Sequence, residues 1–446
     1  MLINAGGGPP PSGGSYTSLA IYNDKPVPAK SAGRATGVDS TGAYWVGGDF
    51  DGGELKFVNV ILASNQDLFV AKISAVHVPV FDLKLTLVGM SDNAQITDME
   101  VDASDNVWIY GYLWGTMTFA GHTLATPTYR NVFTIILSPN GTVLLATISS
   151  SNNHVIPGKL CIIGTSAVVT GSYVGTMTLA GISLSSTSYS DGFVIKLTNA
   201  GVGTNSVVTS GTGSRQTMIF DIDIDSSTGD LYAVGRFTNS SKFGTTTLTA
   251  TGANFFVAKL SSSLAWQSAV TVPFTSGTST YSELAAVKVS GGIIYAIGTF
   301  KRGALNIGSS TIITGGGDVF VVTLTNALVF LSANQGFTSD GKGVDLAANS
   351  AGDVWATGIL IGTNCNFSGT VVSSANYNLF LAKVSSATVF SSFTSSAASS
   401  GSLTPSGLAI GANNAVVLTG IMIGGVNLGG LTETGTNCVF TAVYVP

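Results

Sequence analysis

The stretch VDASDNVWIYG at residues 101–111, followed by NVFTIILS at residues 131–138, decides the fold of this chain, because both phrases recur. Glycines that end a short apolar run stand 60 to 64 residues apart, at Gly48, Gly111, Gly171, Gly235, Gly298, Gly358 and Gly420. A second apolar run follows each glycine and begins at Asp67, Asn131, Asp191, Asn254, Asp318, Asn378 and Asn437. So constant a period indicates one supersecondary unit copied seven times.

Each repeat is predicted to contain four β-strands, most clearly the second repeat. Its third and fourth strands are joined by Asn140 and Gly141, which form a strong hairpin signal between two apolar runs. The linker between second and third strands also recurs, as GTMTFAG at 115–121 and GTMTLAG at 175–181, and we expect it to form an arm. β-branched and aromatic residues dominate the apolar runs, so the chain is predicted to be all-β.

The pattern of the strands predicts how the repeats pack. Strands such as VWIYG at 107–111 are apolar on both faces, so each small sheet needs cover on both sides, which radial stacking provides. The seventh unit ends at its third strand, 439–445, and a spare strand, YTSLAIY at 16–22, precedes the first unit. We therefore predict a seven-bladed β-propeller of four-stranded antiparallel blades, with the ring closed by the N-terminal strand.

The repeat also sets the expected domain boundaries. We predict one large domain rather than several, because repeat folds build one continuous core from many small units. The predicted segments are a Gly/Pro-rich tail at 1–14 and a propeller at 15–446, with blades near 33–88, 89–150, 151–213, 214–276, 277–334, 335–398, and 399–446 plus 15–23.

The recurring phrases resemble a known type of repeat. VDSTGAYWVGG at 38–48 with DLFVAKIS at 67–74, and VDASDNVWIYG at 101–111, are similar to bacterial β-propeller repeats that read VD-x-x-GN-V-Y-V-x-G followed by D-x-F-V-x-K-L. The resemblance covers all seven units, although the third and fifth depart from the first phrase, with GTSAVVTG at 164–171 and SGGIIYAIG at 290–298. It implies a propeller with a recognition or scaffold role, and it supplies no catalytic residues.

The composition excludes several classes of function. Charged residues make up 9% of the chain, against roughly 25% in an ordinary soluble domain, and such surfaces are common in extracellular or virion-surface β proteins. The net charge of −5 comes without a run of Lys or Arg, so we expect no nucleic-acid binding. No apolar stretch approaches the roughly 18 residues that a spanning helix needs, so we expect no membrane insertion.

The N-terminus and the cysteines bear on the compartment. The start, MLINAGGGPPPSGG, has no basic segment followed by an apolar core, so we expect no secretory signal peptide. The three cysteines, Cys161, Cys365 and Cys438, are odd in number and far apart, which predicts buried free thiols rather than a disulfide framework.

Acidic residues supply the candidate metal site. In DIDIDSSTGD at 221–230, Asp221, Asp223 and Asp225 alternate with apolar residues and are predicted to share one face of an innermost strand. The second repeat has a similar acidic strand at 98–102. Two such strands would line an axial channel, where they either hold a cation, with calcium as the candidate, or stay solvated. The Asp or Asn that opens each second run is expected to fix a turn by accepting the backbone N–H two residues on.

Aromatic residues in the arms supply the candidate contact site. Trp114, Tyr129 and Tyr189 are predicted to lie between second and third strands, where their amphipathic rings either bind sugar or protein or pack on their own blade. The only histidines, His77, His122 and His154, have no metal-ligand or dyad spacing.

Together these features favour a non-enzymatic structural or recognition protein, foremost a bacteriophage virion component such as a tail fibre, adhesin or decoration protein. We expect it to be assembled in the host cytoplasm, to contact neighbouring subunits through Met1 to Gly14, and to bind a host surface glycan or protein. One alternative is a bacterial cell-surface or secreted binding module. Another is a glycan-active enzyme with a carboxylate pair at the propeller mouth.

Overall fold

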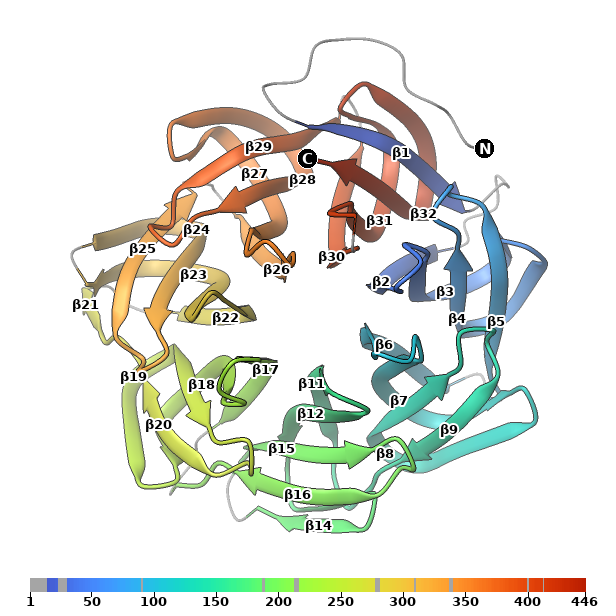
Figure 1. Ribbon diagram of the computed structural model, residues 1–446, viewed down its shortest axis with the longest axis horizontal. Helices are drawn as coiled ribbons and strands as arrows, with labels where there is room; N and C mark the ends of the chain where they lie inside the picture. Colours follow the sequence, from blue (N-terminus) through green and yellow to red (C-terminus); the bar gives the residue numbers. More distant parts are fainter. Residues whose placement is uncertain are drawn as a thin grey trace.

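The protein is built from β-strands arranged in groups around a central opening (Figure 1). The structure, a computed structural model, describes residues 14–22, 30–89, 91–186, 189–211, 216–276, 281–308, 310–336, 340–398, 401–411 and 413–446. None of the residues in these ranges is helical, which confirms the predicted all-β class. Accordingly, this part of the chain has no helix that is long and apolar enough to cross a membrane. The arrangement is propeller-like.

Within each group, consecutive strands pair antiparallel, from an innermost strand at the opening to an outer strand at the rim. The first groups are β2 (Lys30–Val38), β3 (Tyr44–Lys56), β4 (Val60–Ile73) and β5 (Pro79–Leu87); β6 (Asn93–Val101), β7 (Val107–Phe119), β8 (His122–Leu137) and β9 (Val143–Ile148); and β11 (Val155–Ile163), β12 (Ser166–Tyr173), β15 (Asp191–Thr198) and β16 (Gly203–Val208).

The groups that follow are β17 (Thr217–Ile224), β18 (Leu231–Phe243), β19 (Thr246–Leu260) and β20 (Trp266–Val270); β22 (Tyr281–Ser290), β23 (Ile293–Ile307), β24 (Ser310–Thr325) and β25 (Phe330–Gly336); β26 (Lys342–Ala348), β27 (Val354–Phe367), β28 (Thr370–Val384) and β29 (Phe390–Ala398); and β30 (Ser402–Ile410), β31 (Val416–Leu428) and β32 (Leu431–Val445). The N-terminal strand β1 (Ser15–Tyr22) pairs antiparallel with β32, from Ser15 opposite Val445 to Tyr22 opposite Val439.

The second and third strands of a group extend beyond its body as the expected arm. In the second group, β7 and β8 stay paired to the turn at Ala120 and Gly121. The arm reaches back to the preceding group, because Leu87 at the end of β5 pairs with Met117 of β7. The same link joins β10 (Ser150–Ser151) to β13 (Thr176–Leu179), which forms an arm with β14 (Ile182–Ser185); it also joins β21 (Phe274–Ser276) to β23, and β29 to β31. These four arms therefore tie neighbouring groups together at the rim.

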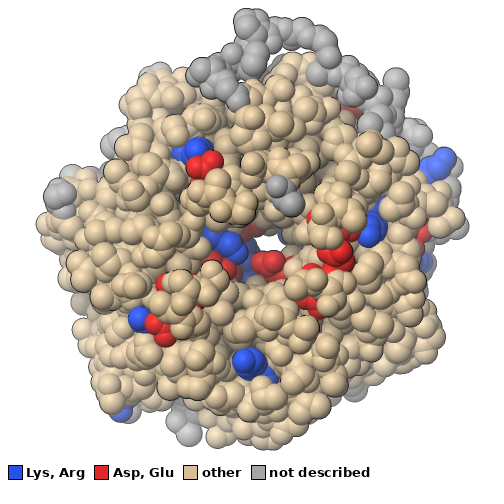
Figure 2. All heavy atoms as spheres, viewed as in Figure 1, with Lys and Arg blue, Asp and Glu red and all other residues tan. Residues whose placement is uncertain are grey.

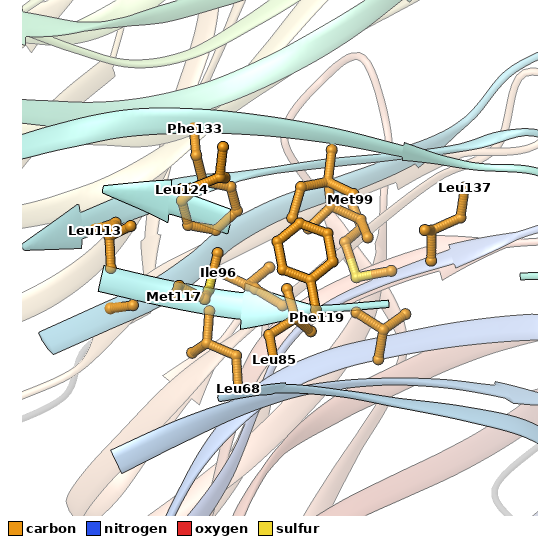
Figure 3. Close-up of a cluster of buried hydrophobic side chains, with 14 of the residues drawn as sticks. Leu68, Leu85, Ile96, Met99, Leu113, Met117, Phe119, Leu124, Phe133 and Leu137 are labelled. Carbon is orange, nitrogen blue, oxygen red and sulfur yellow. The ribbon is translucent and has the colours of Figure 1, made fainter. Parts of the chain in front are cut away.

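The apolar core lies between adjacent groups, as strands that are apolar on both faces require. Figure 3 shows one such cluster, in which Leu68 and Leu85 of the first group meet Ile96, Met117 and Phe133 of the second. Alternate residues of β7 point to opposite sides: Ile109 joins this cluster, whereas Trp108 packs with residues of the third group. All three cysteines are buried thiols that form no disulfide, as predicted.

The repeated glycines, which end a short apolar run in the sequence, lie inside the second strand of each group rather than at a turn. In the second group, Gly111 is paired with Ile96, next to a β-bulge in β6. A Cβ on Gly111 would lie 2.1 Å from the carbonyl oxygen of Gln95 and 2.8 Å from the ring of Phe133. Close approach of a neighbouring strand, rather than a turn, therefore requires glycine here.

The Asp and Asn residues of the second phrase also differ from their expected role. Asn131 lies within β8, and its Oδ1 accepts a hydrogen bond from the hydroxyl of Ser149, 18 residues later. Likewise Asp67 Oδ1 accepts the backbone N–H of Leu87, 20 residues later. These side chains join the third strand to the last residue of the fourth strand, Leu87, or to the residue just after it, Ser149, so the predicted local turn is wrong for them.

Candidate functional site

Charged side chains from the innermost strands meet in the central channel. Figure 2 shows acidic and basic side chains at the opening, on a face that is otherwise mostly uncharged. The channel contains a cavity of about 160 Å³, and β2, β6, β11, β17, β22, β26 and β30 all contribute to its wall. Its ionisable groups are Arg34, Asp98, Glu100, Lys159, Asp221, Lys288 and Asp345.

Three of these aspartates bridge neighbouring groups. Asp98 Oδ2 accepts the backbone N–H of Leu160 at 2.8 Å, from the next group along the chain. Asp221 Oδ2 accepts the N–H of Val287 at 2.9 Å in the same way. The third, Asp345, accepts from Leu408 at 2.9 Å. Each aspartate follows a β-bulge in its strand, which turns its side chain towards the next group. These carboxylates therefore join three pairs of neighbouring groups.

Two lysines offset part of the negative charge. Lys159 of β11 forms an ion pair with Asp345 of β26 and lies 4.0 Å from Asp221 Oδ2. Lys288 Nζ lies 2.9 Å from Asp223 Oδ1. Burial alone would lower the pKa of either lysine, but the surrounding carboxylates outweigh it and raise the pKa of both. Both lysines are therefore positively charged at neutral pH.

Three acidic groups of the channel, Asp98, Glu100 and Asp221, have a pKa above the usual range of a carboxylate. Burial raises the pKa of Asp98 to about 7, against the attraction of Lys159. Burial likewise raises the pKa of Asp221 to about 7. The pKa of Glu100 is also raised by burial, reinforced by neighbouring carboxylates and opposed by Lys288. The channel is therefore a place where protonation changes near neutral pH.

The candidate metal residues Asp221, Asp223 and Asp225 are not brought together as a ligand set. Asp221 and Asp223 bond to the next group, whereas Asp225 follows the end of β17 and accepts the N–H and hydroxyl of Ser227 in a turn. Over the described ranges, no three His, Cys, Asp or Glu side chains converge as metal ligands. The sequence pattern placed Asp221 and Asp223 correctly on an innermost strand, but Asp225 lies beyond its end, and the pattern did not show their partners.

Two of the three predicted contact residues meet on the second group. Trp114 of β7 is 41% exposed, and its ring centroid lies 5.5 Å from that of His154. Tyr129 of β8 approaches the same imidazole at 5.6 Å, edge to face. We call Trp114, Tyr129 and His154 the aromatic patch. Tyr189 is 64% exposed and lies before β15 in the third group, apart from these ring contacts.

Sequence reasoning missed the polar partners of this patch. His154 Nδ1 accepts the backbone N–H of Arg130 at 3.1 Å, and the Arg130 guanidinium lies 4.2 Å from the ring centre of Tyr112. The adjacency of Tyr129 and Arg130 was a usable signal. His154 gave none, because it lies 24 residues from Arg130 in the chain.

Comparison with known proteins gives only remote likenesses. No protein-family model matches the chain, and no curated protein matches it. Similar solved structures include a protein of unknown function from Dyadobacter fermentans, with 10% identity, a TM-score of 0.44, and coverage of 97% of this chain and 99% of that one. Another is the haemagglutinin-neuraminidase of parainfluenza virus 5 with the ligand DANA, with 10% identity, a TM-score of 0.37, and coverage of 95% and 94%.

Proposed function

We propose that the chain is a seven-bladed β-propeller, closed by β1, that serves as a non-enzymatic recognition protein of a bacteriophage particle. The seven repeats support the blade count, and the pairing of β1 with β32 supports closure. The proposed virion roles are tail fibre, adhesin or decoration protein. Docking to neighbouring subunits is assigned to residues 1–14, of which 1–13 lie outside the described residues.

The aromatic patch is the observation that carries the binding role. Trp114 leaves much of its surface in solvent although most large rings of the chain are buried. Trp114 and Tyr129 each contact His154. Rings with one apolar face and one polar edge suit the stacking of a sugar ring. We assign this patch to a host surface glycan.

The channel carboxylates are assigned a structural role rather than a catalytic one. In each of three aspartates, one carboxylate oxygen accepts a hydrogen bond from a backbone N–H of the next group; these are Asp98, Asp221 and Asp345. Removing such an acceptor would leave a buried donor without a partner. The raised pKa of Asp98 and Asp221 is the one feature that favours the glycan-active enzyme instead. Release of reducing sugar from bound glycans, lost in Asp98→Asn, would establish that alternative.

The binding role is tested by glycan-array screening followed by titration calorimetry on the best ligand. Trp114→Ala is expected to weaken binding by about tenfold or more, because exposed tryptophans in contact sites carry much of the binding energy. Tyr189→Ala is the matched control: it removes a more exposed ring from the neighbouring group and is expected to bind as the wild type does. An array without any bound glycan would refute the binding role.

The location is tested separately, by mass spectrometry of purified virions and of bacterial cell surfaces. Peptides of this chain in virions support the bacteriophage role. Peptides confined to the cell surface would instead support the bacterial binding module, which can use the same aromatic patch.

A further inference from the structure

Arg130 is a half-buried residue next to the aromatic patch, and its guanidinium forms no ion pair with a described carboxylate. Its guanidinium stacks on the ring of Tyr112, and its backbone N–H bonds to His154. No carboxylate among the described residues pairs with it, and its buried Nε has no hydrogen-bond partner. Asp49 is close enough to Tyr112 to raise the pKa of its hydroxyl, but this carboxylate already accepts hydrogen bonds from Nε and Nη2 of Arg34. An unpaired cation in such a position is costly unless something else supplies its partner.

A second arginine of the same molecule also lies over a tyrosine ring, and this arginine does have a carboxylate partner. In β18, the Arg236 guanidinium lies 5.3 Å from the ring centre of Tyr281, much as Arg130 lies on Tyr112. There, however, Glu283 Oε2 lies 3.4 Å from Arg236 Nη1 and also accepts the hydroxyl of Tyr281. Arg130 has the ring without the carboxylate. An anionic group from a ligand would complete it as Glu283 completes Arg236.

His154 adds a second donor, on the residue that accepts the backbone N–H of Arg130. Its Nδ1 accepts the N–H of Arg130, so the neutral imidazole carries its proton on Nε2. Nε2 is therefore left as a hydrogen-bond donor on an exposed side chain. The site thus combines two aromatic rings with two groups that only donate, and Arg is the side chain best shaped to hold a carboxylate or sulfate with two parallel bonds.

The geometry points to an anionic saccharide as the ligand, a sugar ring that stacks on Trp114 and Tyr129 and carries a carboxylate or sulfate that binds Arg130 and His154. This inference rests on the proposed glycan-binding function and names the class of glycan. It makes Arg130 the residue that determines specificity and Trp114 the residue that gives general affinity.

The test is calorimetric titration of the full chain with three disaccharides of equal size, one with a uronic acid, one sulfated and one neutral. The wild type is expected to bind one or both acidic sugars about tenfold more tightly than the neutral one, since charge-assisted hydrogen bonds are about twice as strong as neutral ones. Arg130→Gln is expected to abolish this preference while leaving neutral binding unchanged. The two acidic probes distinguish carboxylate from sulfate.

Controls separate this inference from the function on which it rests. Arg302→Gln removes an exposed charge elsewhere in the ring and is expected to keep the preference. Arg130→Lys keeps the charge but loses the paired geometry, and is expected to retain only part of it. Binding that needs Trp114 but is equal for all three sugars would overturn the inference alone. Absence of binding to any sugar would overturn both proposals.

Discussion

At the residue scale, the repeated glycines show how tightly each second strand is pressed against its innermost neighbour. At all seven positions a Cβ would come within 1.8 to 2.3 Å of a backbone carbonyl oxygen. At Gly48, Gly171 and Gly358, as at Gly111, a phenylalanine ring of the third strand closes the same space from the other side. The period that reveals the repeat is thus set by packing at a β-bulge, not by backbone conformation at a turn.

Gly111→Ala is expected to lower the free energy of unfolding by about 2 to 3 kcal/mol, because the added methyl group must push β6 away from β7. The change is measured by urea denaturation followed by circular dichroism. Gly121→Asn is the control, since the arm leaves free space at Gly121 and its φ of +80° is one that asparagine tolerates. Equal stability of Gly111→Ala and the wild type would contradict the packing explanation.

At the scale of the element, aspartate side chains join the innermost strand of one group to the backbone of the innermost strand of the next group. The repeated sequence phrases do not reveal these bonds. Asp98 bonds to Leu160, 62 residues later, and Asp345 bonds to Leu408, 63 residues later. Both separations are one repeat length. Each bond therefore links equivalent strands of adjacent groups, and the channel is lined by these links.

Asp98→Asn tests how much the free energy of unfolding falls when the Asp98 carboxyl group in the channel ionises. Because burial raises the pKa of Asp98 from its usual 3.8 to about 7, folding favours its protonated form. Its contribution is fully favourable below about pH 4 and is lost as the pH rises through 7. Asparagine keeps the acceptor oxygen without the charge. The variant is expected to match the wild type near pH 4 and to be more stable at pH 8 by up to about 4 kcal/mol, as measured by chemical denaturation at both pH values.

Asp353→Asn is the control, because the pKa of Asp353 is shifted in the opposite direction to that of Asp98. Its hydrogen bond with Lys383 lowers the pKa of Asp353, so this pair stabilises the fold above about pH 4 and ceases to do so as the pH falls. This variant should lose stability near neutral pH and not in acid. An unchanged pH profile in Asp98→Asn would mean that the carboxylate is not held in the way that the channel geometry indicates.

The elements also show where sequence reasoning succeeds. Alternation and hairpin signals act over a few residues, so the strands, the arms and the two apolar faces of β7 were predictable. Asn131 was misassigned because a local turn is the usual role of such a residue, whereas β8 runs straight through it. Arg130 and His154 come from different groups, and only the folded chain places them in contact.

At the scale of the whole molecule, the two ends of the chain meet in one sheet. Leu19 of β1 is 2% exposed, pairs with Ala442 of β32, and packs with Leu418 and Phe440. The last group has only three strands from the C-terminal part of the chain. Without β1, the edge of β32 would lack a partner, and unpaired edges promote association between chains.

Leu19→Asp is therefore expected to destabilise the fold by about 3 kcal/mol or more, because it places an unpaired charge in the core. Thermal melting and size-exclusion chromatography measure the effect. Ser15→Asp is the matched control on the same strand, at an exposed position. Removal of residues 1–22 should lower the melting temperature and cause aggregation, whereas removal of residues 1–13 should leave melting unchanged. If the chain without residues 1–22 melts as the intact protein does and remains monodisperse, β1 does not close the ring.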